Sequence, residues 1–372
     1  MRWPLLALVP LLAGSPAAAA PAARPAPAAP QPSGCATALA AARAQQTRLL
    51  AAAPSLSVLL LGEIHTSAAD HDWQLASLDA IARRRPRLVL GLEMVPAARQ
   101  AALDRYSAGA IQETAFLQEV GWQEVWGHDP DLYLPLLRWA RRQGVPLLAL
   151  NAEPEVVRRV RRLGLAAVPA SGREGIGPPA PVGPAYRQRL TAAWQAHRPP
   201  ATAGSPAGSS IDLERFIDSQ RLRDRAMAER IAAAHRREPD RLVVALIGVG
   251  HLEGGDGVPR QLRALGMGRV EQAQRPELPP GCGPAPAGAR LGAYLESADG
   301  AVWVRQVAPG SAAAAAGLRP GDRLLELNGE PVQRAGQVIR RVAAQPAGVP
   351  LRLGLERNGR RLTLELQLAP AP

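Results

Sequence analysis

Four side chains that can do chemistry follow the ends of short apolar runs in the sequence. Glu63 and His65 come after one run, Glu93 follows a second, and His251 follows a third. Both histidines stand in the spacing Gly-x-x-His, at 62–65 and 248–251. Imidazole and carboxylate groups together suit a divalent transition metal such as zinc, iron, cobalt or manganese. The same groups can also act without metal, as paired general acids and bases.

The elements that must position these side chains follow from the pattern between residues 35 and 275. Apolar runs of strand length, rich in Leu and Val, lie at 56–61, 88–92, 145–150 and 242–247. They alternate with amphipathic segments that predict helices at 71–84, 96–106, 130–143, 153–163 and 212–236. The alternation is typical of parallel βαβ units. The sequence therefore predicts an α/β fold with a mainly parallel sheet and helices on both faces.

Open parallel sheets bind ligands in the crevice outside the carboxyl ends of their strands. Asn151 follows the third run and is expected in that crevice with the Glu and His side chains. His71 and Asp72 open the next helix, where they either cap it or reach the crevice. A stretch rich in Pro and Gly at 169–208 is expected to be a long loop, of the kind that is usually functional or mobile. Three histidines in polar or loop-like surroundings are expected at the surface: His128, His197 and His235.

Length and composition indicate two domains and exclude one class of partner. The chain has 372 residues, enough for two domains, and a net charge of +12 in which all 44 basic residues are Arg. These Arg residues are spread along the expected helices and do not gather with aromatic side chains into a stacking surface. No nucleic-acid partner is therefore predicted.

The N-terminal residues have the pattern of an export signal. Arg2 precedes an apolar run at 3–12, and small residues at 17–20 suit cleavage, so residues 1–20 are expected to be a signal peptide. The run is too short for a transmembrane anchor. Ser15 stands where a lipoprotein would carry Cys, so lipidation is not expected. The mature chain is predicted to be periplasmic, beginning with an Ala/Pro-rich spacer at 21–34.

The two cysteines flank the first predicted domain, which spans 35–275. In an oxidising compartment Cys35 and Cys282 either form a disulfide that closes this domain or remain two free thiols. A Pro/Gly-rich linker is expected at 276–288, followed by a second domain at 289–370.

Several motifs of the first domain resemble the ChaN family of haem-binding uptake proteins. They are the segments LGEIH at 61–65, GLEM at 91–94, PLLALN at 146–151 and GVGH at 248–251, together with the stretches 122–137 and 220–228. The wider superfamily includes the Tiki metalloproteases, with paired Gly-x-x-His motifs and a Glu, and is similar to erythromycin esterases. The resemblance thus supports the candidate site, but it does not indicate which reaction the site carries out.

For a ChaN relative, the resemblance implies haem or iron handling at the cell envelope. It implies that a Tyr holds the haem iron and that a homodimer encloses the porphyrin. Tyr186, beside the long loop, is the first candidate for the iron ligand, and His71 is a further haem-contacting candidate; the alternative for Tyr186 is an ordinary residue at a helix start. Covalent haem attachment is excluded because no Cys-x-x-Cys-His motif occurs.

The second domain shows short alternating strands at 302–307, 323–327, 351–356 and 361–366, with a hairpin signal at Asn358-Gly359. The run 308–329 resembles a PDZ domain of the bacterial type. Such a domain captures a protein C-terminus or an extended peptide by strand addition. Alternatively, it only packs against its neighbour or dimerises. The loop expected to hold the terminal carboxylate is formed by Leu291, Gly292, Ala293 and Tyr294.

Three functions remain open from the sequence. The favoured one is an exported protein that binds haem or iron while its PDZ domain recruits a partner. The second is a metal-dependent hydrolase in which Glu63, His65, Glu93 and His251 bind the metal and activate water. The third is a non-catalytic adaptor. A serine protease is not expected, because no Gly-x-Ser-x-Gly element occurs.

Overall fold

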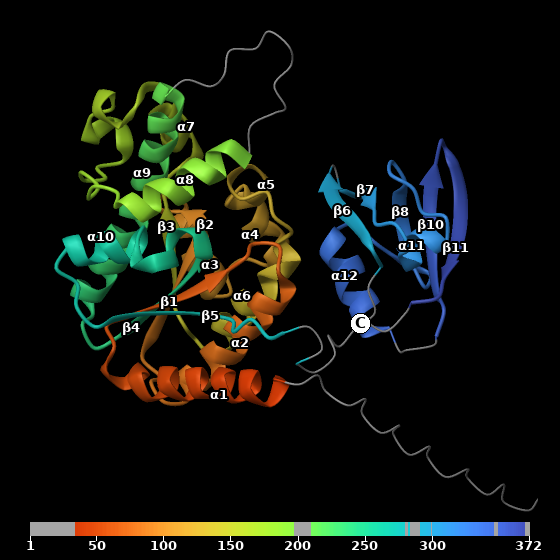
Figure 1. Cartoon of the computed structure of the whole chain (residues 1–372), viewed down its shortest axis with the longest axis horizontal. Helices are drawn as coiled ribbons and strands as arrows, with labels where there is room; N and C mark the ends of the chain where they lie inside the picture. Colours follow the sequence, from red (N-terminus) through yellow and green to blue (C-terminus); the bar gives the residue numbers. More distant parts are fainter. Residues whose placement is uncertain are drawn as a thin grey trace, which may run out of the picture.

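The computed structural model describes residues 34–196, 210–279, 282, 291–298, 300–345 and 349–368. The predicted signal peptide, most of the predicted spacer and linker, and His197 lie outside these residues. The described chain forms an α/β domain and a smaller, β-rich domain (Figure 1). Within this part of the chain, none of the helices combines the length and the apolar character needed to cross a membrane.

A five-stranded parallel sheet forms the centre of the first domain and confirms the predicted fold class. Its strand order is β3-β2-β4-β1-β5, and every neighbouring pair is parallel. The strands are β1 (Val58–Glu63), β2 (Leu88–Pro96), β3 (Leu147–Asn151), β4 (Leu242–Gly248) and β5 (Val270–Gln274). The first four match the predicted apolar runs. The edge strand β5 was not predicted, because its mixed, partly exposed residues give no apolar run.

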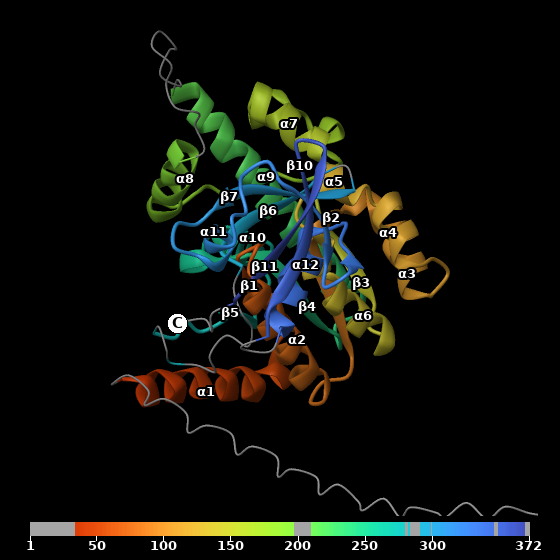
Figure 2. The same ribbon diagram turned by 90° about the vertical axis from the view of Figure 1, so that its right-hand side faces the viewer.

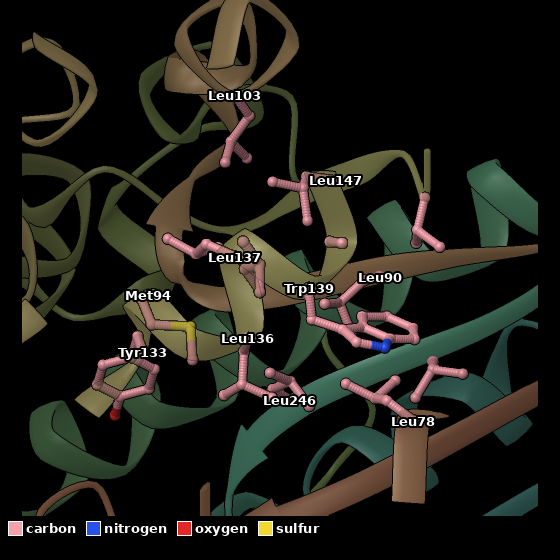
Figure 3. Close-up of a cluster of buried hydrophobic side chains, with 14 of the residues drawn as sticks. Leu78, Leu90, Met94, Leu103, Tyr133, Leu136, Leu137, Trp139, Leu147 and Leu246 are labelled. Carbon is pink, nitrogen blue, oxygen red and sulfur yellow. The ribbon is translucent and has the colours of Figure 1, made fainter. Parts of the chain in front are cut away.

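Both faces of this sheet are covered, because successive side chains of a buried strand point to opposite sides. Leu59 and Leu61 pack on one side with α2 (Ala68–Ala82), α3 (Gln100–Ser107) and α6 (Leu134–Arg142). Figure 3 shows this cluster, with Leu90 and Leu246 of the sheet beside the residues of α6. Val58 and Leu60 pack on the other side, where the covering helices are α9 (Ser210–Arg237) and α10 (Val258–Ala264).

The remaining helices of this domain are α1 (Cys35–Ala52), α4 (Glu113–Glu119), α5 (Trp122–Val125), α7 (Pro154–Leu163) and α8 (Pro184–Ala196). Helix α8 lies inside the stretch 169–208 that was expected to be a loop, so that expectation is wrong in part. Pro184 starts the helix, and Tyr186 and Leu190 pack against Ile217 of α9. Tertiary packing thus supports a helix that the Pro- and Gly-rich composition obscures.

A disulfide joins Cys35, at the start of α1, to Cys282, beyond β5. This confirms the first of the two alternatives for the cysteines. The bridge closes a loop across a sequence separation of 247 residues. It therefore ties together the two ends of the α/β domain and restricts its unfolded state.

The second domain is an antiparallel sheet in the order β11-β10-β8-β7-β6, with β9 paired to β8. Its elements are β6 (Ala293–Ala298), β7 (Ala301–Val307), α11 (Ala312–Ala315), β8 (Arg323–Leu327), β9 (Glu330–Pro331), α12 (Ala335–Ala344), β10 (Leu351–Arg357) and β11 (Arg360–Leu366). Asn358 and Gly359 both have positive φ, as the predicted hairpin turn requires. Strand β6 was not predicted, and it forms an edge of the sheet.

The two domains meet where α12 contacts a short 3-10 helix at Pro130–Leu132. In Figure 1, α12 lies on the side of the second domain that faces the first domain, and in Figure 2 the second domain lies in front of the first. The backbone N–H of Gly336 donates to the Asp129 carboxylate. Arg334 and Arg340 lie 3.0 and 2.9 Å from the two carboxylate oxygens of Asp131, whose side chain is only 2% exposed. We call this set of contacts the interdomain clamp.

Candidate functional site

The carboxyl ends of β1, β2 and β4 bring the predicted side chains to one edge of the sheet. Glu63 ends β1 and lies beside Gly248, the last residue of β4. The Gly248 N–H donates to Glu93 Oε2 over 2.6 Å. Glu63, Glu93 and His251 are buried, whereas the His65 side chain is 30% exposed. His65 is thus the member of this set that reaches the surface.

Glu63 is the centre of one hydrogen-bonded group. Its Oε1 accepts from the Tyr133 hydroxyl at 2.7 Å and lies 3.0 Å from His65 Nδ1. Its Oε2 lies 3.3 Å from His71 Nε2. Burial alone would raise the pKa of Glu63, but the hydrogen bonds from His65, His71 and Tyr133 outweigh it and lower the pKa to about 2. The carboxylate is therefore ionised at neutral pH.

His71 thus reaches the crevice, which was one of its two predicted positions. The helix cap is instead supplied by Ser67, whose side chain accepts from the Asp70 N–H. The backbone carbonyl of Ser67 lies 2.7 Å from His71 Nδ1, whereas the buried Nε2 contacts Glu63 but has no hydrogen-bond partner. Asp72 is exposed on the outer side of α2.

A second group forms around His251. Its Nδ1 lies 2.6 Å from Asp224 Oδ1, and its Nε2 lies 3.5 Å from Glu93 Oε1. Arg223 contacts the same Glu93 oxygen at 3.1 Å. Burial would raise the pKa of Glu93. The charges of His251 and Arg223 are the largest of the effects that oppose burial, and the pKa is lowered as a result. The second carboxylate is thus also held ionised.

His65 joins the two groups because its ring fits against Gly248. A Cβ atom at Gly248 would lie 2.5 Å from His65 Cε1, so any larger residue there would displace the ring. Burial would lower the pKa of His65, but its hydrogen bond to Glu63 and the charges of Glu93 and Glu63 raise it. The glycine of the second Gly-x-x-His motif therefore makes room for the histidine of the first.

Trp126 and His128 extend the site toward the surface. The His65 ring centroid lies 4.6 Å from Trp126 and 5.1 Å from His128, and the last two are 5.2 Å apart. We call these three partly exposed side chains the aromatic rim. Burial and the neighbouring His65 lower the pKa of His128. His128 is partly exposed, as expected for a surface residue, but its turn places it beside His65 and Trp126 at the strand ends.

The sequence reasoning also missed Tyr133, Arg223 and Asp224. Tyr133 packs beside Met94 in the apolar cluster of Figure 3, while its hydroxyl leaves the cluster to reach Glu63. Asp224 lies on α9 and holds His251. Both residues fall in stretches that resemble ChaN, at 122–137 and 220–228. Their residue types alone give no signal, because each lies within an amphipathic helical pattern.

The predicted metal ligands do not share one point in space. Glu63 is bonded to His65, and His251 is bonded to Asp224, so the imidazoles are divided between two groups. Within the described chain, no three His, Cys, Asp or Glu side chains are grouped so that they could hold a metal ion. The residues in this arrangement therefore do not fit a metal site.

The candidate haem ligands are likewise engaged. Tyr186 is 2% exposed, and its hydroxyl donates to Asp224 over 2.9 Å, at the start of α8. Burial and the charge of Asp224 raise its pKa, which disfavours an iron-binding phenolate. His71 is buried, and its Nδ1 faces the Ser67 carbonyl. By contrast, the three rings of the aromatic rim are partly exposed, and they meet at interplanar angles of 72°, 45° and 65°.

A separate hollow of about 370 Å³ lies on the α/β domain away from these residues. Its lining includes Leu165, Val168, Pro179, Asp218 and Arg221. No member of the Glu/His site or of the aromatic rim contributes to that lining. It is not part of the candidate site.

In the second domain, the predicted carboxylate-binding residues form the start of edge strand β6. Gly292 has φ +77°, and a Cβ there would lie 2.2 Å from the Cβ of Ser311. Ala293 and Tyr294 are the first residues of β6, and Tyr294 is 62% exposed. Leu291 is buried beneath them. Helix α12 runs beside this strand, where the Ala335 N–H donates to Ser297 Oγ at 2.8 Å.

Comparisons with known proteins agree with this division. The family described as "Haem-binding uptake, Tiki superfamily, ChaN" matches residues 49–262, and a PDZ domain matches residues 303–357. The solved structure of ChaN of Campylobacter jejuni with cofacial haem is 15% identical, with a TM-score of 0.46. That match covers 62% of this chain and 84% of that one.

Curated relatives are proteases that share only a part of their length with this chain. The periplasmic pH-dependent serine endoprotease DegQ of Escherichia coli is 39% identical over 66 residues, which are 18% of this chain and 14% of that protein. The magnetosome formation protease MamE of Paramagnetospirillum magneticum is 37% identical over 112 residues, which are 30% and 14%. The family match, in contrast, spans more than half of this chain. The chain belongs to the ChaN family of the Tiki superfamily, and its ChaN-like domain is followed by a PDZ domain.

Proposed function

We propose that this protein is exported and binds haem through its α/β domain, while its PDZ domain recruits a protein partner. The observation that carries the proposal is the aromatic rim of His65, Trp126 and His128 within the segment that matches the ChaN family. Haem is the cargo in this proposal. Its iron accepts an imidazole as axial ligand, and its ring packs on aromatic side chains.

The charge of the protein also favours such a ligand. Haem carries two carboxylates, and the chain has a net charge of +12 made entirely by Arg. Guanidinium groups pair with carboxylates in a bidentate geometry. Arg223 is 24% exposed and contacts Glu93 at the edge of the site. A basic surface thus supports capture of an anionic porphyrin.

Strand β6 supports the proposed recruitment of a partner. It is an edge strand, and an edge strand offers unpaired main-chain groups to an incoming peptide. The exposed Tyr294 lies on that strand and α12 runs beside it. A protein C-terminus or an extended peptide is therefore the class of ligand that this surface suits.

Titration of the mature chain with haemin, followed by absorbance in the Soret region, tests the proposal. We expect a saturable, shifted band with a fixed number of haems per chain. Iron-free protoporphyrin serves as the matched control, because it packs on the rim but cannot accept a ligand. A signal that rises without saturation at the position of free haemin would contradict haem binding.

A second candidate function rests on the Asp224–His251 pair. A carboxylate 2.6 Å from one ring nitrogen orients the imidazole, as a general base requires. With Glu93 beside its other nitrogen, His251 would transfer a proton during hydrolysis of a peptide presented by the PDZ domain. Cleavage of PDZ-binding peptides, with and without added divalent metal, tests this candidate. Loss of cleavage in His251→Ala would support it, whereas unchanged partner binding without any cleavage would favour an adaptor.

A further inference from the structure

Strand β6 and helix α12 are the two elements that border the expected peptide site of the PDZ domain. Among the described strands, β6 pairs only with β7, so its other edge offers unpaired main-chain groups. Figure 1 shows β6 and α12 together on the side of the second domain that faces the first. The expected peptide site therefore lies where the two domains meet.

The position of the carboxylate-binding loop sets the direction of a bound peptide. That loop, at 291–294, leads into the start of β6 (Ala293–Ala298). A peptide whose terminal carboxylate is held there, and whose main chain pairs with β6, runs antiparallel to the strand. An extended chain advances about 3.4 Å per residue, so roughly the fifth residue from the peptide end lies beside Ser297. Residues further upstream leave the strand at that end.

The N-terminal end of α12 stands where such a peptide leaves β6. The backbone N–H of Ala335, the first residue of α12, donates to Ser297 Oγ over 2.8 Å. The N–H of the next residue, Gly336, donates to the Asp129 carboxylate of the α/β domain. Because the first N–H groups of a helix point out of its N-terminal end, Ser297 and Asp129 are neighbours there. A peptide that passes Ser297 therefore meets the α/β domain.

The first turn of α12 is fitted to the α/β domain. A Cβ at Gly336 would lie 2.8 Å from Asp131 Cβ and 3.0 Å from Asp129 Cγ, so only glycine allows this approach. Glycine is otherwise a poor helix former. The sequence of this turn contains no acidic residue, and Asp129 and Asp131 supply the negative charge that a helix N-terminus favours. The α/β domain thus holds one side of the peptide site in place.

We propose that both domains bind the partner peptide. Strand β6 and α12 hold the last residues of its C-terminus, and the docked α12 directs the residues upstream onto segment 126–132 of the α/β domain. Trp126, His128 and Pro130 of this segment are partly exposed. The inference rests on the recruitment of a partner proposed above, and it names the kind of partner. That partner is a protein whose unfolded C-terminal segment is longer than the strand it adds to β6.

Photo-crosslinking to the full mature chain tests where each part of the peptide lies. The probes are two libraries of decapeptides with random C-terminal residues, which carry benzoylphenylalanine at either the second or the seventh residue from the free C-terminus. Mass spectrometry locates the labelled residues. We expect the seventh-residue probe to label segment 126–132 and the second-residue probe to label only the PDZ domain. Amidation of the C-terminus removes the carboxylate and should abolish both labels.

Gly336→Ala tests the role of the docked helix, because the nearest atoms to its added methyl group all belong to Asp129 and Asp131. We expect it to lose the label on segment 126–132 and to keep the label from the second-residue probe. Arg341→Ala is the matched control, since Arg341 lies on α12 but pairs with Glu330 of its own domain, and it should match the wild type.

Each result of this experiment bears on the inference. Seventh-residue labels that fall only within the PDZ domain of the wild type would overturn it, while recruitment by the PDZ domain would stand. Equal labelling of segment 126–132 in the wild type and Gly336→Ala would also overturn it, because the docked α12 would then not direct the peptide. If neither library labels the wild type, both the inference and the proposed recruitment fail.

Discussion

The two domains place their polar groups in opposite ways. At the strand ends, the α/β domain buries several ionisable side chains in one network: Glu63, His71, Glu93, Asp224 and His251. Among the described residues of the PDZ domain, Asp322 is the only buried charged side chain, and it pairs with Arg357. Burying charge is costly unless every group is paired. The first domain thus keeps an expensive network for a site, whereas the second recognises ligands through the main chain of an edge strand.

Removing the centre of the network should have the largest effect. Glu63→Ala leaves His65, His71 and Tyr133 without their shared acceptor, and we expect the free energy of unfolding to fall by about 3–5 kcal/mol. Urea unfolding measures this. Glu238→Ala removes an exposed ion pair with Arg241 and should lower the free energy of unfolding far less. Equal losses in the two variants would show that the buried network stabilises the protein no more than a surface ion pair does.

Acid should weaken the same network. The pKa of Glu63 is lowered from 4.5 to about 2 in the folded protein, so its stabilising contribution is complete above pH 4.5 and is lost as the pH falls toward 2. The contribution is on the order of 3 kcal/mol, at about 1.4 kcal/mol per pH unit. We expect the difference in unfolding free energy between wild type and Glu63→Gln to shrink over this range. A difference independent of pH would contradict the assigned ionisation.

The PDZ domain should respond to backbone changes instead. Gly292→Ala places a methyl group against Ser311 at a residue with positive φ, and we expect a loss of about 1–3 kcal/mol and weaker peptide binding. Gly359→Ala is the matched control, because its φ is also positive but no atom lies within 4 Å of the added carbon. Haemin affinity should not change in either variant. A change there would mean that the start of β6 directly affects the α/β site.

The interdomain clamp should give the smallest effect on stability. Replacing Arg334 and Arg340 together by Ala removes both ion-pair partners of the buried Asp131 carboxylate. Because this carboxylate regains water when α12 moves away, we expect a loss of about 1 kcal/mol or less. Small-angle X-ray scattering should show a larger radius of gyration if the clamp holds the domains together. An unchanged radius of gyration would mean that other contacts hold the two domains together.

The clamp also tests whether the domains are coupled. Asp131 lies two residues from Tyr133 and three from His128, so a loosened turn would move the aromatic rim. We expect haemin affinity to weaken by a few fold in the double variant. An unchanged affinity, together with an expanded shape, would mean that the rim is positioned by the α/β domain alone.

The parts of the fold that could be predicted are those with a local signal. The four central strands are continuous apolar runs, and the helices between them are amphipathic, so their positions followed from periodicity. Strands β5 and β6 lie at sheet edges and carry polar residues, and α8 lies in a Pro- and Gly-rich stretch. Strand β5 depends on pairing with the distant β1, and α8 on packing against α9, whereas β6 pairs with the neighbouring β7 but has too few apolar residues to give a signal.

The candidate site also contains residues that could be predicted from a local signal and residues that could not. Glu63, His65, Glu93 and His251 could be predicted because they follow strands, and the parallel sheet brings strand ends together. His128 could not, because its position depends on a turn held by Trp122 and by α12. Such long-range contacts leave no pattern in a single sequence.

The location of the iron in crystals grown with haemin tests the central claim most directly. Anomalous scattering at the iron edge gives that position without any assumption about the ligand. We predict a peak beside Trp126, at the aromatic rim next to the strand ends. A peak elsewhere, such as in the hollow lined by Leu165 and Arg221, would contradict haem binding at this site.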